Sequence, residues 1–301
     1  MKIGIDLGGS NIGFALVNNK NKIIEKIEIP IEKHKNIEHD ILNIIDFYIN
    51  KFKEKNKIEL IGIAGPGNPN IEQLNITNIV NLGIKELNFK EIFEKYKIKI
   101  DIKNDAKSAG IAEFKYGALK PYKDAVFLCL GTGIGSAVFL NGKELKNKKN
   151  NGFELGHMII QKDGNICNCG KRGCFETYCS IKRFKDKTKD ILNLEDVSSE
   201  EILEKIKENI KNVKINNLIE EFINNLIIGL SNIIDIFEPE AICFGGSFVF
   251  FKEIFYEKLV EEMNLRKYKF NKDSMPDILL SEFKNDAGII GAVIVDKNKK
   301  K

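Results

Sequence analysis

The sequence contains no tryptophan and only six cysteines and three histidines among its 301 residues. It also lacks a long apolar run, since no stretch approaches the ~18 uncharged residues that a membrane-spanning helix needs. The opening residues, MKIGIDLGGS, place Asp6 and two glycines where a signal peptide needs an apolar core. Lysine and arginine total 47 against 43 aspartates and glutamates, a balance that indicates neither a nucleic-acid nor a membrane partner. Six cysteines are too few for a disulfide scaffold in a chain of this length, and we expect a cytoplasmic protein.

Strands and helices alternate along the first part of the chain, which favours a layered α/β domain with a mixed sheet. Near residues 117–123 the chain changes element, and a second strand–turn–strand segment begins at Ala125. At about 150 residues per domain, the length suits two domains. We expect a small N-terminal α/β domain at residues 1–117 and a larger α/β domain with a metal-binding loop at residues 118–285. A final helix within residues 286–301 should pack back on the first domain. Apolar periodicity predicts strands at residues 2–17 (with a central turn), 23–29, 60–64, 98–103 and 241–244, and helices at residues 36–52, 89–96, 106–116 and 215–237.

Two segments of the sequence have the same layout. Residues 5–19 read IDLGGSNIGFALVNN, and residues 128–142 read LCLGTGIGSAVFLNG. Each places a glycine turn inside an apolar hairpin, and each ends in Asn-Asn or Asn-Gly, which is typical of a type I′ turn. One such match could be coincidence, but two matching hairpins, one opening each half, indicate a duplicated fold.

The glycine turns are candidate anion sites, because without a Cβ atom the backbone N–H groups can approach a phosphate closely. Taken alone, each turn is better explained as an ordinary hairpin turn. Neither matches the phosphate loop GxxxxGK[ST], and no GxGxxG precedes a helix. Asp6 lies at the mouth of the first turn, where a carboxylate beside phosphates suits a magnesium ion held through water. The candidate cradles are Gly8, Gly9 and Ser10 in the first turn and Gly131, Thr132 and Gly133 in the second.

Asn104 and Asp105 follow a predicted strand and precede a predicted helix. Either residue could simply cap that helix, which is a common use of both side chains. The functional alternative is that Asp105 acts as a general base, accepting a proton from an alcohol that attacks a γ-phosphoryl group.

His157 is followed by three closely spaced cysteines in the string GHMIIQKDGNICNCGKRGCFE. One imidazole and three thiolates suit tetrahedral zinc, and the intervening glycines permit the turns that bring them together. The alternative is a buried histidine beside reduced cysteines. Four protein ligands, His157, Cys167, Cys169 and Cys174, would leave the metal no open position, so we expect a structural zinc.

The sequence resembles the ROK family (repressors, open reading frames and kinases) of the actin, sugar kinase and Hsp70 superfamily. The resemblance covers nearly the whole chain, through IDLGGSNI, KNDAKSAG, LGTGIGSAV, NGFELGHM, CNCGKRGCFETYCS and FGGS in the family's order. It implies a two-domain actin-like (ribonuclease H-like) sugar kinase fold, with a cleft between the domains that holds ATP, magnesium and a hexose.

The resemblance also implies roles for individual residues. Asp105 would be the catalytic base that deprotonates the sugar 6-hydroxyl. His157 would bind zinc through one ring nitrogen and the sugar through the other. The implied sugar ligands are Gly65, Asn104, Asp105, Glu154, His157 and Glu176. The implied ligands of the phosphates, magnesium and nucleotide are Asp6, Gly8, Gly9, Ser10, Gly131, Thr132, Gly133, Gly245 and Gly246.

The expected function is that of an ATP-dependent hexokinase acting on glucose. The family usually has Thr-Lys where Ser10-Asn11 stand, and the loop after Gly67, NPNIEQLNITN, differs from that of typical bacterial glucokinases. Other strings resemble allose kinases, so allose, N-acetylmannosamine, N-acetylglucosamine and fructose remain alternative substrates. A sugar-sensing regulator of the same family is the rival, although such members carry a helix-turn-helix domain for which there is no room before Ile3. A catalytically inactive sugar-binding protein is the third alternative. Relatives imply a homodimer with no nucleic-acid or membrane partner.

Overall fold

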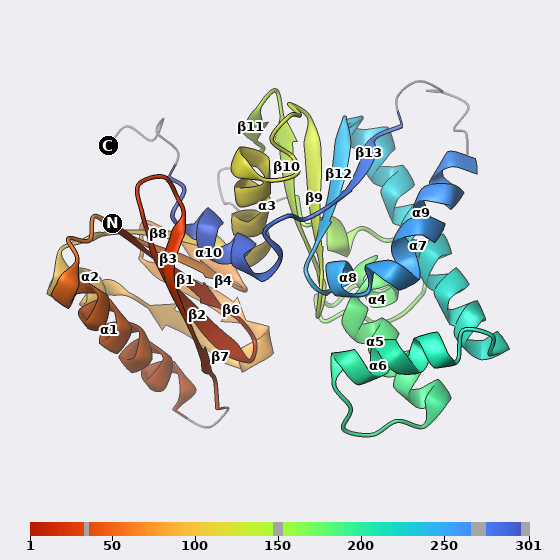
Figure 1. Cartoon of the computed structure of the whole chain (residues 1–301), viewed down its shortest axis with the longest axis horizontal. Coiled ribbons are helices and arrows are strands. Elements are labelled where there is room, and N and C mark those ends of the chain that lie inside the picture. Colours follow the sequence, from red (N-terminus) through yellow and green to blue (C-terminus); the bar gives the residue numbers. More distant parts are fainter. Residues whose placement is uncertain (33–35, 147–152, 266–274, 296–301) are drawn as a thin grey trace. The chain divides into compact units, whose positions relative to one another are not determined.

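The computed structural model describes residues 1–32, 36–146, 153–265 and 275–295 (Figure 1). The chain divides into two units. The first contains Met1–Gly117 and the segment that begins at Asn285, and the second contains Ala118–Leu145 and Phe153–Lys284. Within the described ranges, no helix has the length and apolar character needed to cross a bilayer.

A five-stranded mixed sheet forms the centre of the first unit, in the order β3-β2-β1-β4-β8. β1, β2 and β3 are antiparallel neighbours, whereas β1, β4 and β8 run parallel. The carboxyl ends of these three parallel strands therefore meet at one edge of the sheet. The strands are β1 (Lys2–Leu7), β2 (Asn11–Val17), β3 (Ile23–Pro30), β4 (Leu60–Gly65) and β8 (Lys99–Asn104).

Helices cover both faces of this sheet. α1 (Ile37–Lys55) buries Ile41, Ile45 and Ile49, which recur at helical spacing, in one cluster with alternate side chains of β1. On the opposite face, α10 (Ala287–Ala292) packs Ile289 closely against the glycine backbone of β1 and β2. α3 (Asp105–Tyr116) and α10 lie against each other. The final helix is shorter than predicted, and residues 296–301 of the expected helix lie outside the described residues.

The segment after Gly67 is not the loop that the sequence predicted. It forms a small antiparallel sheet of β5 (Asn68–Asn70), β6 (Asn75–Ile79) and β7 (Ile84–Asn88). Ile76, Ile84 and Leu87 are buried in the core of the first unit, so these short strands are held by tertiary packing. α2 (Lys90–Tyr96) then leads into β8.

The second unit repeats the sheet of the first. Its order is β11-β10-β9-β12-β13, with β9, β10 and β11 antiparallel and β9, β12 and β13 parallel. The same succession of directions confirms the duplication inferred from the two glycine hairpins. The strands are β9 (Ala125–Leu130), β10 (Ile134–Leu140), β11 (Lys143–Glu144), β12 (Ala241–Gly245) and β13 (Asp277–Leu280).

The type I′ turn is confirmed at only one of its two predicted places. Asn141 and Gly142 both have positive φ (54° and 75°) and join β10 to β11 as such a turn requires. After β2 the chain instead makes a longer loop. There the Asn18 side chain accepts hydrogen bonds from the N–H groups of Lys20 (2.9 Å) and Lys22 (3.0 Å). This local bonding stabilises the longer connection.

Helices pack on the second sheet around an aromatic core. Phe184, Phe222 and Phe255 lie at its centre, with ring centroids 4.4–5.4 Å apart. The mixed sheets and flanking helices of both units confirm the expected α/β class. The helices are α4 (Glu176–Cys179), α5 (Ile181–Leu192), α6 (Ser199–Glu208), α7 (Val213–Phe237), α8 (Ser247–Phe250) and α9 (Lys252–Leu265), with a 3₁₀ turn at Leu155–His157.

Candidate functional site

Three of the candidate residues in the first unit lie at the carboxyl ends of its parallel strands. Asp6 stands near the end of β1, Gly65 ends β4 and Asn104 ends β8. Gly65 pairs directly with Asn104, whose side-chain amide donates a hydrogen bond to the Gly67 carbonyl (3.4 Å). This is the edge where open α/β sheets bind ligands.

Asn104 and Asp105 have different structural roles at the start of α3. The Asn104 side chain accepts a hydrogen bond from the N–H group of Lys107 (3.2 Å) and is therefore the helix cap. Asp105 is the first residue of the helix, and its carboxylate accepts a bond from the adjacent Ala106 N–H (2.8 Å). Because Asn104 supplies the cap, the capping explanation does not account for the carboxylate at Asp105.

Asp6 is held in an environment that opposes its negative charge. Burial, and then the neighbouring charge of Asp105, raise the pKa of Asp6 to about 7. The nearby Lys26 ammonium is engaged by Glu28 (2.6 Å) and Asp286 (2.8 Å), so it compensates Asp6 only in part. Carboxylates whose negative charge is only partly neutralised by neighbouring groups are the oxygen ligands that a hard divalent cation such as magnesium prefers.

The first glycine turn has fewer backbone N–H groups available to a phosphate than the sequence predicted. The Gly8 N–H group donates to the Asn11 carbonyl (2.9 Å), so this donor closes the turn itself. The Ser10 carbonyl accepts from the N–H group of Ile31 (2.7 Å), which fixes the far side of the turn. Gly9 is partly exposed and Ser10 is exposed, and these two residues are the ones that remain open to a ligand.

The second unit brings its two glycine segments together. Gly245 pairs with Cys129 near the end of β9, one residue before Leu130, which precedes the turn at residues 131–133. Gly246 has a positive φ of 68°, and an added Cβ there would lie 2.8 Å from the Leu130 carbonyl oxygen. Only glycine fits this close approach. Within the turn, the Gly131 N–H donates to the Gly133 carbonyl (3.0 Å) and Thr132 is exposed.

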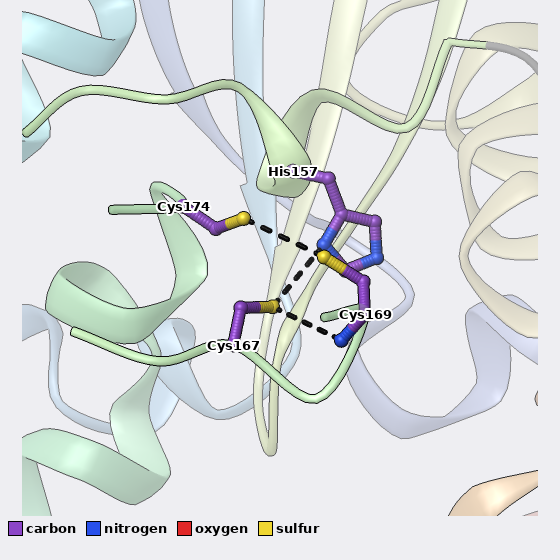
Figure 2. A group of neighbouring side chains, drawn as sticks. All are labelled: His157, Cys167, Cys169 and Cys174. Carbon is purple, nitrogen blue, oxygen red and sulfur yellow. Dashed lines mark hydrogen bonds between the residues drawn. The ribbon is translucent and has the colours of Figure 1, made fainter. Parts of the chain in front are cut away.

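The histidine and the three cysteines converge as the sequence predicted (Figure 2). Their potential ligand atoms all lie within 4.8 Å of one another. The Cys167 sulfur lies 3.6 Å from Nδ1 of His157, and the Cys169 and Cys174 sulfurs are also 3.6 Å apart. A tetrahedron with zinc–sulfur bonds of about 2.3 Å has edges of about 3.8 Å, so the two 3.6 Å separations are compatible with a tetrahedral zinc site.

The backbone around these four residues explains why they meet. Gly170 and Gly173 have φ values of 89° and 80°, a conformation that favours glycine, and short bridges join Ile159 to Cys174 and Ile166 to Arg172. Burial raises the pKa values of the Cys167 and Cys174 thiols, so their thiolates need a neighbouring positive charge.

The remaining candidate ligands of the second unit adjoin this cluster. Glu154 is exposed just before the 3₁₀ turn that contains His157. Glu176 begins α4, and its Oε1 lies 3.1 Å from the Cys167 sulfur and 3.6 Å from Nδ1 of His157. Because Nδ1 faces the cysteines, the second ring nitrogen, Nε2, is the one left for another partner (Figure 2).

Sequence reasoning missed several residues that shape these sites. Lys26 comes from β3 and Gly288 from the far end of the chain, yet both lie beside Asp6, and Asp286 forms an ion pair with Lys26. Lys182, on α5, donates its N–H to the Gly131 carbonyl (3.0 Å). The only sequence signal for any of them was the small-residue run Asp286-Ala287-Gly288.

Comparison with known proteins gives one consistent result. The profile of the ROK family matches residues 2–299. The chain is 26% identical to the glucokinase of Thermotoga maritima, over 99% of this chain and 97% of that protein. It is also 26% identical to the xylose repressor of Caldicellulosiruptor bescii, over 97% of this chain and 76% of the repressor.

A solved structure shares the fold. The ROK family glucokinase from Streptomyces griseus, in complex with glucose and AMPPNP, aligns with a TM-score of 0.81 at 20% identity and covers 97% of each chain. This likeness confirms the two-domain, actin-like sugar kinase fold that the sequence predicted. The family profile spans nearly every residue, and we conclude that this chain is a member of the ROK family.

Proposed function

We propose that this protein is an ATP-dependent hexokinase that transfers the γ-phosphoryl group to the 6-hydroxyl of a hexose, with glucose as the first candidate. The observation that carries the proposal is the position of Asp105. Asp105 directly follows Asn104, the last residue of β8. Asn104 caps the helix, so the Asp105 carboxylate does not serve as the cap, and the negative charge of Asp105 contributes to the raised pKa of Asp6. Similarity to the Thermotoga maritima glucokinase supports the same conclusion.

In this proposal the two units, residues 1–117 with the C-terminal segment and residues 118–285, are the two functional domains. From the first, Asp105 takes the proton of the attacking hydroxyl while Asn104 and Gly65 contact the sugar. From the second, Glu154, Glu176 and Nε2 of His157 bind sugar hydroxyls. The phosphates and the nucleotide would be held by Gly8, Gly9 and Ser10, by Gly131, Thr132 and Gly133, and by Gly245 and Gly246.

The proposed phosphoryl transfer requires few further catalytic groups from the protein. Phosphoryl transfer depends mainly on in-line positioning and charge neutralisation, so a single base is sufficient on the protein side. Magnesium, held through Asp6, would neutralise phosphate charge when bound. A structural zinc would fix the ring of His157 and leave its outer nitrogen to orient the sugar.

The test is Asp105→Asn, assayed by coupled ADP release. General-base catalysis contributes about 100-fold or more, so we expect transfer to fall at least that far while sugar binding, measured by calorimetry, is retained. Asp235→Asn, at an exposed position on α7, is the matched control and should behave as wild type. An Asp105→Asn enzyme with near-normal turnover would refute the assignment.

The substrate is tested with the same assay over a panel of sugars. Glucose, allose, fructose, N-acetylglucosamine and N-acetylmannosamine are the members, because epimers and N-acetyl derivatives differ at single positions of the ring. Release of ADP with one of the others in preference to glucose would reassign the substrate within the same chemistry. Sugar binding without ADP release from any of them would identify a non-catalytic sugar-binding protein.

A sugar-sensing regulator is the second candidate, because similarity to the Caldicellulosiruptor bescii xylose repressor is as high as to the glucokinase. Sequence-specific DNA binding in a mobility-shift assay, released by sugar and without ADP release, would favour it. We also propose a homodimer, which sedimentation equilibrium would test.

A further inference from the structure

Ser136 is a polar residue within a row of core residues on β10. Because side chains alternate along a strand, Ser136 lies on the same face as Ile134 and Val138, which are buried in the core of the second unit. Ser136 is itself only 2% exposed. A hydroxyl costs free energy in such a place unless its hydrogen bonds are satisfied, so the partners of this side chain indicate its role.

The hydroxyl of Ser136 makes two hydrogen bonds to one short segment. It donates to the carbonyl of Phe153 (2.6 Å) and accepts from the N–H group of Leu155 (3.1 Å). The donor and the acceptor of this side chain are therefore both engaged by the residues that flank Glu154. The Glu154 side chain is exposed, and its backbone carbonyl accepts from the N–H group of His157 (3.0 Å).

Phe153 needs this support because its backbone is in the left-handed region. Its φ is 63°, a conformation that is an outlier for a bulky side chain. Such residues keep their conformation only where the surrounding structure imposes it. Here the bond from Ser136 fixes the direction of the Phe153 carbonyl, and the partly buried Phe153 ring packs against the core. Without that bond Phe153 can relax to a common φ, which would turn the backbone at Glu154 as well.

The other side of Glu154 is held by a close backbone contact. Gly156 lies directly on the carbonyl of Ile134, and a Cβ atom at position 156 would clash with that oxygen. Leu155, between Glu154 and Gly156, is buried in the core. Residues of β10 therefore fix the segment from Phe153 to Gly156 at both ends, and Glu154 is the residue of this segment that is exposed.

We propose that Ser136 is a positioning residue that sets the direction of the Glu154 carboxylate and thereby the affinity for the sugar. The sugar part rests on the proposed function, in which Glu154 binds a sugar hydroxyl, whereas the hold of Ser136 on the segment does not. In this proposal Ser136 touches neither substrate and acts only through Phe153 and Leu155. Removal of its hydroxyl deprives one backbone group of each of these residues of its partner, so the Glu154 side chain loses its fixed direction.

The first test measures hydrogen exchange of the Leu155 amide in wild type and in Ser136→Ala. The Ala137 amide, in the middle of β10 opposite Phe127 of β9, is the internal reference. We expect exchange at Leu155 to be several-fold faster in the variant and exchange at Ala137 to be unchanged. Ser136→Cys, which is close in size but has a weak donor and acceptor, should show the same change. Unchanged exchange at Leu155 would overturn the proposal, and equal acceleration at both amides would show general loosening of β10 and overturn it as well.

The second test measures two dissociation constants by calorimetry, one for the panel sugar that binds wild type most tightly and one for a non-hydrolysable ATP analogue. We expect Ser136→Ala to bind the sugar about 5-fold more weakly, which corresponds to the loss of about one hydrogen bond, and to bind the nucleotide as wild type does. Thr188→Ala is the matched control, because it removes another buried hydroxyl of the same unit, which donates to the Phe184 carbonyl on α5 (2.9 Å). It should bind both ligands as wild type does.

The outcomes of the second test separate this proposal from the proposed function. Unchanged sugar affinity in Ser136→Ala would overturn the positioning role, and so would equal weakening of sugar and nucleotide, which is what a general disturbance of the unit produces. Absence of sugar binding in wild type would instead contradict the proposed function, and the hold of Ser136 on the segment would then be decided by hydrogen exchange at Leu155.

Discussion

Gly288 lies directly against the carboxylate of Asp6. A Cβ atom at this position would come within 2.8 Å of the carboxyl carbon and would clash with its Oδ2. The Gly288 carbonyl also accepts a hydrogen bond from the Ser108 hydroxyl on α3 (2.8 Å). The start of α10 is therefore fitted to Asp6 on one side and tied to α3 on the other, and the absent side chain decides where the carboxylate can point.

Gly288→Ala should displace Asp6 from its present position. We expect a loss of about 1–3 kcal/mol in the free energy of unfolding, which is typical of overpacking, and a marked rise in the KM for magnesium-ATP. Ser108→Ala is the control, because it removes the hydrogen bond to Gly288 but leaves the space for the carboxylate unchanged. It should cost about 1 kcal/mol without the change in KM. A Gly288→Ala enzyme with an unchanged KM would contradict the role given to Asp6.

Asp6 should make stability depend on pH in a defined direction. With its pKa raised to about 7, the folded protein keeps a proton that the unfolded chain releases near pH 4. The stabilising contribution is therefore fully present below about pH 4 and is lost as the pH rises through about 7. In Asp6→Asn this loss disappears. We expect the variant to gain about 2–4 kcal/mol relative to wild type between about pH 4 and pH 8, since one pKa unit is ~1.4 kcal/mol and the side chain is partly exposed. Parallel stability curves in urea titrations would rule this out.

Elements with a single clear period could be predicted from the sequence. Residues 2–17 and 36–52 carry alternating and helical patterns, and the structure has strands and a helix there. Residues 68–88 could not be predicted, because their strands are short and polar residues interrupt the apolar ones. What holds them is the buried core beneath, which is formed by distant segments. The final helix, by contrast, was predicted from its small residues, and α10 is only shorter than expected.

The residues of the candidate sites also differ in whether they belong to a local sequence pattern. Asn104 and Asp105 form one local pattern, and the Cys₃His cluster, His157 with its three cysteines, forms another. In each case a short stretch of sequence was enough to predict the arrangement of the residues within it. Lys26 and Lys182 reach Asp6 and the glycine turn from other elements, and no local spacing signals that contact. The hydrogen bond that occupies the Gly8 N–H was equally hidden, because it depends on the conformation of the turn and not on its composition.

The Cys₃His cluster should hold about one zinc per chain and contribute to stability. Cys174 is fully buried, and Cys174→Ser replaces a thiolate ligand with a hydroxyl that binds zinc poorly. We expect the variant to lose its zinc, by elemental analysis of protein purified without chelators, and to unfold at a lower temperature. Cys129→Ser, a partly exposed cysteine at the end of β9, should keep the metal. Metal-free wild-type protein, or zinc retained in Cys174→Ser, would refute the site.

The start of α6 offers a test of local stability outside both sites. Ser198 and Glu201 form a reciprocal capping box, in which the Ser198 hydroxyl accepts from the Glu201 N–H (3.1 Å) and the Glu201 carboxylate accepts from the Ser198 N–H (2.7 Å). Ser198→Ala should lower the free energy of unfolding by about 1 kcal/mol, because it leaves one N–H group of the first turn without its cap. Ser199→Ala, one residue later, removes only a part-buried hydrogen bond from Lys185 (2.9 Å) and should cost clearly less. Equal costs for the two serines in chemical denaturation would contradict the capping box.

The bond from the Ser198 N–H lowers the pKa of Glu201, so the carboxylate's stabilising effect is present above about pH 4 and is lost as the pH falls through the folded-state pKa. Glu201→Gln should therefore be less stable than wild type at neutral pH, and the difference should shrink in acid.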